Sequence, residues 1–316
     1  SLRSDGSVGV YGQAAGLFDI TGNLTIEAGD QIDIRHDFGE GTPPTIRTGG
    51  DFTATAGSGI SGATGSFLIA GGDLSLTATD GPIGVDRLQG SNIFVTASGA
   101  GSVEHAEADN DFIASAASFR TGLNSIITGG NIIITAPGAV DLGNSTAGGY
   151  VSVDGESIQF ANIGAGGFVT LNALGTALGA EGIAGGSIDA GSSISLSGNS
   201  IALTGPITGA GPLFATGTGG AVSISDADVA GSIVVAAVGN ISGSYVSGGD
   251  IRLTSDADIN ASATANGGYT DPATGAIADG NVFADAAGNA TLTDSGAARM
   301  FGVNAGQAAT VTNATA

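Results

Sequence analysis

A repeat of about nineteen residues constrains the fold of this chain more than any other feature. Segments that open with a turn and continue with alternating apolar residues occur at GGDFTATA (49–56), GGDLSLTA (71–78), GSNIFVTA (90–97), ADNDFIASA (108–116), GGNIIITA (129–136), GGYVSVDG (148–155) and GGFVTLNA (166–173). Their first inward apolar residues are predicted to be Phe52, Leu74, Ile93, Phe112, Ile132, Val151 and Val169, at steps of 22, 19, 19, 20, 19 and 18 residues. Self-similarity at such a short period predicts a solenoid.

Each copy has the pattern of a short strand that follows a turn. In the copy at 71–78, Leu74 and Leu76 are expected to point inward and Ser75 and Thr77 outward, because strand side chains alternate. The Gly-Gly-Asp/Asn opening is typical of turns, since Gly tolerates backbone angles that other residues avoid and Asp or Asn bonds nearby backbone. We therefore interpret Asp51, Asp73 and Asp250 as turn residues.

Two weaker apolar patches follow each strand. The second patch contains Ile83, Val85, Val103, Val140, Leu142, Ile158 and Phe160, and the third contains Leu88, Ile126 and Ile163. Three strands per repeat would make one triangular coil, and stacked coils would bury the inner face and pair their backbones. The fold class predicted is all-β, a parallel β-helix of about 19-residue coils.

The pattern continues toward the end of the sequence with less regular spacing. Further copies are GNLTIEA (22–28), GSSISLSG (191–198), GGAVSISD (219–226), GSIVVAAV (231–238), GGDIRLTS (248–255), GNATLTDS (288–295) and QAATVTN (307–313). Irregular spacings predict loop insertions at about 35–48, 174–190, 205–218 and 260–280. We expect one continuous β-helix over 1–316, with a looser part from about 261, where Ala fills 17 of 56 positions.

Composition supports this fold and excludes several functions. Gly provides 58 of 316 residues, far above its usual share of about 7%. The net charge of −22 disfavours binding to nucleic acid or to anionic membranes. The chain has no Cys, which excludes disulfides and thiol catalysis, and no run of 18 apolar residues, so we expect no membrane insertion. Because it begins with Ser1, we expect a processed product or part of a longer protein.

The repeat, which opens with Gly-Gly-Asp/Asn and continues as Leu/Ile-x-Leu/Ile/Val-Thr-Ala, resembles the filamentous haemagglutinin repeats of two-partner secreted exoproteins. Contact-dependent inhibition toxins have a similar stalk. The resemblance covers most of 20–316 and implies a right-handed β-helix, export through an outer-membrane transporter and adhesion at the bacterial cell surface. The Asn-Pro-Asn motifs of the family's secretion domain do not occur here, so we place the chain in the central shaft.

The best metal candidate in the sequence is the acidic segment SVEHAEADND (102–111). Glu104, Glu107, Asp109 and Asp111, beside His105, would share a face if the segment were a strand, and carboxylate oxygens suit Ca²⁺. A second cluster contains Glu27, Asp30, Asp33, His36, Asp37 and Glu40. We prefer to interpret both clusters as solvated acidic corners, so no metal or other cofactor is expected, and Ca²⁺ binding is the alternative. The two histidines should lie about 17 Å apart and form no common site.

No catalytic motif is present, and no catalytic residue or enzymatic activity is expected. The alternative is a β-helical carbohydrate-active enzyme, a lyase, hydrolase or tailspike, but these need paired carboxylates in a groove lined with aromatic side chains. Six Asn-x-Ser/Thr sequons begin at Asn23, Asn144, Asn240, Asn260, Asn289 and Asn313. We attribute their number to turn Asn residues that precede an outward Ser or Thr, and glycosylation there remains an alternative.

The predicted function is the structural shaft of an extracellular adhesin or bacterial surface filament that presents binding loops. Its stalk-like pattern also fits a toxin-delivery protein. Expected partners are a receptor or glycan on a host or neighbouring cell, and an outer-membrane transporter during secretion. The sequence shows no cap at either end of the repeats, so we expect the ends to be covered by more of the same polypeptide, which is the preferred case, or by another copy of the chain in end-to-end association. The rod should measure roughly 60–75 Å per chain at the strand spacing.

Overall fold

The computed structural model describes residues 1–12, 17–36, 44–122, 126–175, 182–266, 269–270, 277–278, 280–293 and 300–312. In this part of the chain every regular element is a β-strand, and there is no helix that is long and apolar enough to cross a membrane. The chain divides into two compact units, Ser1–Gly155 and Glu156–Ala316.

The strands of both units are short and follow one another closely. The first unit contains β1 (Leu2–Ser4), β2 (Val8–Gly12), β3 (Leu17–Ile20), β4 (Leu24–Ala28), β5 (Gln31–His36), β6 (Thr45–Thr48), β7 (Phe52–Ala56), β8 (Gly59–Gly62), β9 (Phe67–Ala70), β10 (Leu74–Ala78), β11 (Ile83–Gly90), β12 (Ile93–Ala97), β13 (Ala100–Ala108), β14 (Phe112–Ser115), β15 (Ser118–Thr121), β16 (Ile126–Thr128), β17 (Ile132–Thr135), β18 (Val140–Ala147) and β19 (Val151–Gly155). The second unit contains β20 (Ile158–Ala165), β21 (Val169–Ala173), β22 (Ile183–Ala190), β23 (Ile194–Gly198), β24 (Ile201–Gly209), β25 (Leu213–Gly217), β26 (Val222–Val229), β27 (Ile233–Ala237), β28 (Ile241–Ser247), β29 (Ile251–Ser255), β30 (Ile259–Ala265), β31 (Tyr269–Thr270), β32 (Ile277–Ala278), β33 (Asn281–Ala286), β34 (Ala290–Thr293), β35 (Met300–Ala305) and β36 (Ala309–Thr312).

Each unit is a parallel β-solenoid with two stacks of strands, which we call sheet A and sheet B. In the first unit sheet A has the order β1-β4-β7-β10-β12-β14-β17-β19, and in the second unit β21-β23-β25-β27-β29-β33-β35. The strands between them belong to sheet B, except β31 and β32, which form a small antiparallel hairpin. The predicted fold class is therefore confirmed.

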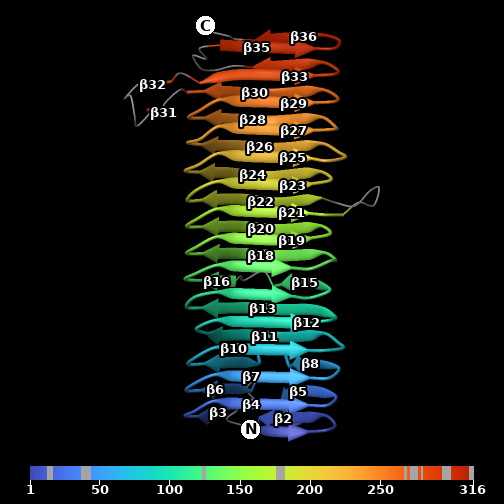
Figure 1. Ribbon diagram of the computed structural model, residues 1–316, viewed down its shortest axis with the longest axis vertical. Helices are drawn as coiled ribbons and strands as arrows, with labels where there is room; N and C mark the ends of the chain where they lie inside the picture. The colour runs from blue at the N-terminus through green and yellow to red at the C-terminus, as the bar shows by residue number, and fades with distance from the viewer. Residues whose placement is uncertain are drawn as a thin grey trace. The chain divides into compact units, whose positions relative to one another are not determined.

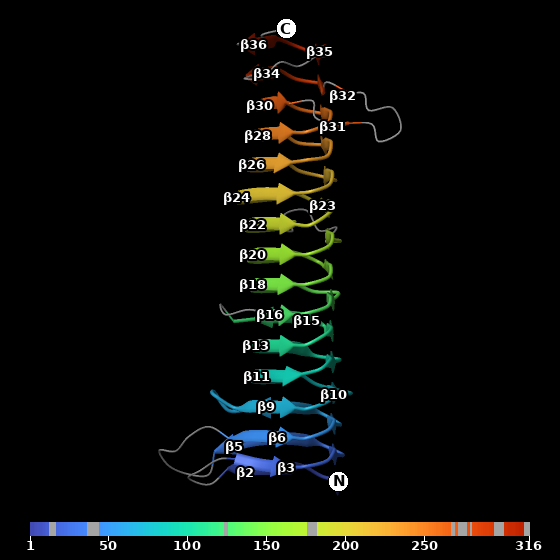
Figure 2. The same ribbon diagram turned by 90° about the vertical axis from the view of Figure 1, so that its left-hand side faces the viewer.

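The two views of the ribbon show how each solenoid winds. In each unit, sheet A lies on the near side of Figure 1 with its strands running to the right, and sheet B returns to the left behind it as successive coils of that unit rise. Figure 2 shows the two sheets on opposite sides of each coil. Both units therefore wind as right-handed coils, as the sequence resemblance implies.

The core of each unit is a column of apolar side chains at matching positions of successive coils. In the first unit the register aligns Phe52, Leu74, Ile93, Phe112, Ile132 and Val151. In the second it aligns Val169, Ile194, Leu213, Ile233, Ile251 and Val282. All twelve side chains are fully buried, and burying one stabilises the fold by about 1.5–3 kcal/mol relative to exposure. The seven inward positions predicted from the repeat are confirmed.

The expected triangle of three strands occurs in only some coils. The return path is split in two at β2 and β3, β5 and β6, β8 and β9, and β15 and β16. In other coils the second and third apolar patches share one strand. β11 contains Ile83, Val85 and Leu88, all buried, but Asp86 and Arg87 both lie outside the core between them. The strand continues through this break in alternation.

Three of the predicted copies belong to the other sheet. The segment 219–226 contains the start of β26, and the segments 288–295 and 307–313 contain β34 and β36, which are all sheet B strands. The insertion expected at 205–218 is wrong, because β24 and β25 fill that range with one regular coil. Glycine turns precede strands of both sheets, so the local pattern does not distinguish them. Much of the other three expected insertions lies outside the described residues.

The Gly-Gly-Asp/Asn motif has a structural cause that involves the preceding coil. The side-chain oxygen of each turn Asn or Asp accepts a hydrogen bond from the equivalent residue one coil later. In the first unit this series of bonds forms a ladder, in which the accepting residues are Asn23, Asp51, Asp73, Asn92, Asp111 and Asn131. Their donors are, in the same order, the backbone N–H of Asp51 (3.0 Å), the backbone N–H of Asp73 (3.0 Å), Asn92 Nδ2 (2.8 Å), and the backbone N–H groups of Asp111 (3.2 Å), Asn131 (2.8 Å) and Tyr150 (3.0 Å). The predicted turn roles of Asp51 and Asp73 are confirmed.

Glycine precedes the ladder residue because the side chain of the coil below occupies the space of a Cβ atom. A Cβ on Gly72 would collide with the Asp51 carboxylate, and one on Gly130 would collide with the Asp111 carboxylate. In the second unit, Asp250 accepts from the backbone N–H (2.8 Å) and Nδ2 (3.0 Å) of Asn281. The ladder thus holds the turns of successive coils in register.

Candidate functional site

The acidic segment at 102–111 does not form a cluster of ligands. Glu104 and Glu107 are exposed on β13, and the His105 ring bonds the Glu107 carboxylate, with Nε2 2.9 Å from Oε1. Asp109 is exposed in the turn that follows. Asp111 belongs to the ladder, where its Oδ1 atom accepts both the N–H (2.8 Å) and the Nδ2 (3.0 Å) of Asn131. Among the described residues, no three histidine or carboxylate groups could together hold a metal ion.

The second acidic cluster is divided among separate partners. Glu27 pairs with Arg3, and Asp33 pairs with Arg35 at 2.6 Å. Asp30 accepts hydrogen bonds from Ser58 and, at 2.9 Å, from Ser7. These bonds, that of Ser58 first, lower the pKa of the Asp30 carboxyl because they favour its charged form. Asp37, Glu40 and the His36 side chain lie outside the described residues.

The two histidines lie on different strands of sheet B. His36 ends β5, and His105 lies in β13. The pairing runs from β5 through β8 and β11 to β13, so the two backbones are three strand steps apart, or about 14 Å at the usual spacing. This separation agrees with the expectation that they form no common site.

Three of the six sequons have the structural explanation that the sequence indicates. Asn23 belongs to the ladder, and Asn240 accepts a hydrogen bond from the N–H of Asp258 at 3.1 Å. Asn289 donates its N–H to the Asp258 carboxylate at 2.6 Å. These three Asn residues serve in turn-to-turn bonding, whereas Asn144 and Asn260 lie on sheet B strands and Asn313 lies outside the described residues.

The outward face of sheet A in the first unit has one column that is mainly Thr or Ser and one column that varies. One outward column of the first unit contains Glu27, Thr55, Thr77, Thr96, Ser115, Thr135 and Asp154. The neighbouring column changes from Thr25, Thr53 and Ser75 to Phe94, Ile113 and Ile133 and then to Ser152. The inner face is therefore apolar at every coil, whereas the outer face differs between coils mainly in its second column.

A pocket of about 460 Å³ on this outward face was missed by the sequence analysis. It lies over β29, β33 and β35 and is lined by the outward residues Arg252, Thr254, Phe283, Asp285, Gly302 and Asn304. The 31-residue step between Arg252 and Phe283 hides their pairing in the sequence. An exposed Phe and an Arg in an acidic, aromatic-poor chain were the available signals.

Comparison with known proteins adds no identification, because no protein-family model, curated protein or solved structure matches the chain.

Proposed function

We propose that the chain is the structural shaft of an extracellular adhesin or surface filament of the filamentous-haemagglutinin kind. The observation that carries this proposal is the contrast between the two sides of sheet A. In both units the inward column is apolar at every coil. In the first unit turn hydrogen bonds link successive coils, whereas one outward column changes from polar to apolar residues and back. Such a solenoid provides a stable scaffold whose surface is free to present different binding groups.

The net charge of the chain supports a function that does not involve nucleic acid. The net charge of −22 favours solubility and disfavours contact with phosphate backbones. The partners proposed are a receptor or glycan on a host or neighbouring cell, and an outer-membrane transporter during secretion. Association of the chain with further copies of itself is part of the same proposal.

A binding role is preferred to carbohydrate hydrolysis. Hydrolysis by the usual mechanism needs two carboxyl groups roughly 5–9.5 Å apart across the scissile bond. Asp285 is the one carboxylate that lines the pocket among the described residues. The toxin-delivery stalk differs from the adhesin shaft in what it is attached to, and no feature of the described residues favours it.

Protease treatment of intact producing cells tests the proposal. The chain should be digested while a cytoplasmic marker stays intact, and deletion of the partner transporter should retain the chain inside the cell. Protection of the chain in intact cells, with the transporter present, would overturn the proposal.

A further inference from the structure

We propose that the outward pocket of β29, β33 and β35 binds one neutral hexopyranose ring. This inference deepens the proposed function, because it names the chemistry of one group that the shaft would recognise.

The strand register places these positions in two rows. Arg252, Phe283 and Gly302 form one row across the three strands. Thr254, Asp285 and Asn304 form the other row, two residues further along each strand. With about 4.8 Å between strands and 3.3 Å per residue, the grid measures roughly 10 Å by 7 Å. This area fits a single sugar ring better than a long chain.

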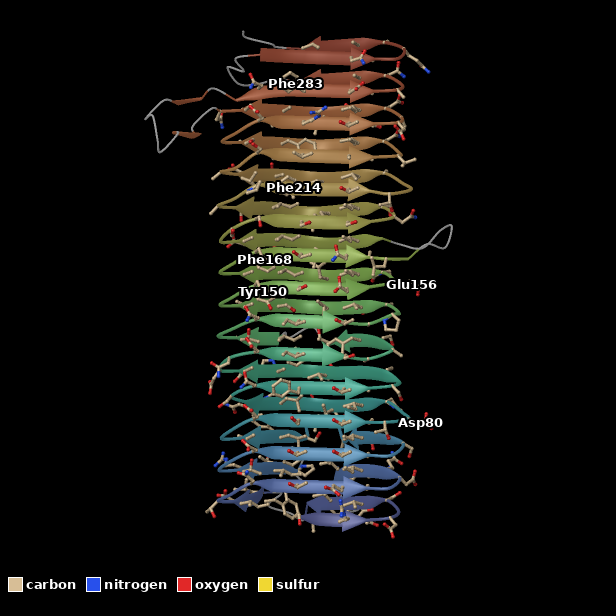
Figure 3. All side chains as sticks on the ribbon, viewed as in Figure 1. Asp80, Tyr150, Glu156, Phe168, Phe214 and Phe283 are labelled. Atoms are coloured by element: carbon tan, nitrogen blue, oxygen red, sulfur yellow. The ribbon has the colours of Figure 1, made fainter. Side chains whose placement is uncertain are left out.

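Phe283 provides the apolar platform of the pocket. Its side chain is 38% exposed, and Figure 3 shows it on the near, outward face of sheet A. A Cβ on Gly302 would lie 3.0 Å from Phe283 Cδ1, so the ring leans over the glycine of the next strand. One side of the ring is thus supported by backbone, while the exposed remainder is free to cover the C–H face of a pyranose.

The second row provides hydrogen-bonding groups of both kinds. Asp285 accepts a bond from Asn304 Nδ2 at 3.0 Å, which fixes both side chains and leaves further acceptor capacity on the carboxylate. A carboxylate accepts from two hydroxyl donors, and a side-chain amide both donates and accepts. Neighbouring hydroxyl groups of a sugar need this combination, because each hydroxyl also donates and accepts.

The charges of the pocket favour a neutral ring. Arg252 is exposed, forms no ion pair with another described residue and lies one strand from Phe283. Its guanidinium is a pure donor suited to ring oxygens. Asp285 balances its charge, and the remaining charge of the chain is strongly negative, so an acidic sugar would be repelled.

Saturation-transfer NMR on the full 316-residue chain tests this inference. The probes are the methyl glycosides of glucose, galactose, mannose and N-acetylglucosamine, together with glucuronate. We expect at least one neutral glycoside to bind and glucuronate to bind more weakly. Phe283→Ala and Asp285→Asn should each weaken binding by about tenfold or more, which corresponds to about 1.4 kcal/mol.

Phe214→Ala is the matched control, because Phe214 is also an exposed, outward phenylalanine of sheet A (45% exposed) but lies outside the pocket. It should leave binding unchanged, and thermal melting should show that all three variants fold. The absence of binding by every neutral probe, stronger binding of glucuronate, or equal loss in Phe214→Ala and Phe283→Ala would each overturn the inference. These results concern the purified chain, so they are independent of the cell-surface test above.

Discussion

The Asp111 carboxylate accepts two hydrogen bonds from Asn131, one from the backbone N–H at 2.8 Å and one from Nδ2 at 3.0 Å. The two residues are twenty positions apart and occupy the same turn of neighbouring coils. Asp111 thus supports the next coil in the same way that Asn92 supports Asp111 at 3.2 Å. The turn residues therefore stabilise the stack as well as the turns themselves.

Replacement of Asp111 by Ala should destabilise the fold by about 1–3 kcal/mol, because the part-buried Asn131 would lose the acceptor of both donors. Asp109→Ala is the control, since the exposed Asp109 precedes the ladder residue by two positions, and it should change stability by about 0.5 kcal/mol or less. Denaturant unfolding measures both. Equal effects of the two substitutions would show that the ladder contributes no stability.

Gly130→Ala should destabilise the chain, because its Cβ would collide with the Asp111 carboxylate. Gly84→Ala should be neutral or slightly stabilising, since nothing lies within 4 Å of a Cβ there. Thermal melts of the two variants measure the difference. A neutral Gly130→Ala would contradict the steric reason given for the second glycine of the motif.

The sequence predicted the core of this fold well, because every coil must bury apolar side chains at its inward positions. Ile132 and Val151 are both inward, and the 19-residue step between them is also the step of the solenoid. The grouping of all copies into one repeat failed for those that contain Val222, Ala290 and Ala309, which lie in sheet B. Turns before both sheets use glycine, and the strands of both sheets alternate between inward and outward residues. The local sequence pattern indicates which side chains of a strand point inward. The sheet to which that strand belongs depends on how many residues the intervening corners contain.

The candidate pocket was beyond sequence reasoning for a related reason. Arg252 and Phe283 are paired across neighbouring strands but lie 31 residues apart in the sequence. A fixed step of nineteen residues therefore does not predict that they are neighbours. The acidic segment was visible in sequence, but the ladder that uses Asp111 is a contact between coils. Both the pocket and the contact of Asp111 depend on how the strands of successive coils are aligned. The sequence of one repeat does not specify this alignment.

Ile132→Asp should cost several kcal/mol, because it places an unpaired charge in a fully buried position of the core column. Thr135→Asp, three residues later on the exposed face of the same strand, should cost about 0.5 kcal/mol or less. Thermal melts compare the two. Similar losses would contradict the assignment of inward and outward faces.

Calcium should bind weakly and without fixed stoichiometry, because the exposed carboxylates are spread over the surface. Calorimetry with Ca²⁺ should give no saturable tight site. The double variant Glu104→Ala with Asp109→Ala should titrate like the original chain. A tight site that this variant abolishes would refute the expectation and restore the acidic segment as a metal centre.

Tyr245 should resist ionisation as long as the chain is folded. Its side chain is fully buried and its hydroxyl donates to the Ser242 carbonyl oxygen at 3.1 Å. Burial raises the pKa of this phenol far above its ordinary value of 10.0, because the charged form would lose its hydration. The unfolded chain releases this proton near pH 10 and the folded chain does not, so the contribution of Tyr245 to stability is complete below pH 10.0 and falls as the pH rises above it.

Alkaline titration followed by tyrosinate absorbance measures this difference. The denatured protein should release the Tyr245 proton near pH 10, whereas the folded protein should retain it there. Tyr245→Phe should leave the folded-state titration unchanged and remove one group from the denatured-state titration. If the substitution instead removed a group that titrates near pH 10 in the folded protein, Tyr245 would be accessible to solvent and its burial in the second unit would be wrong.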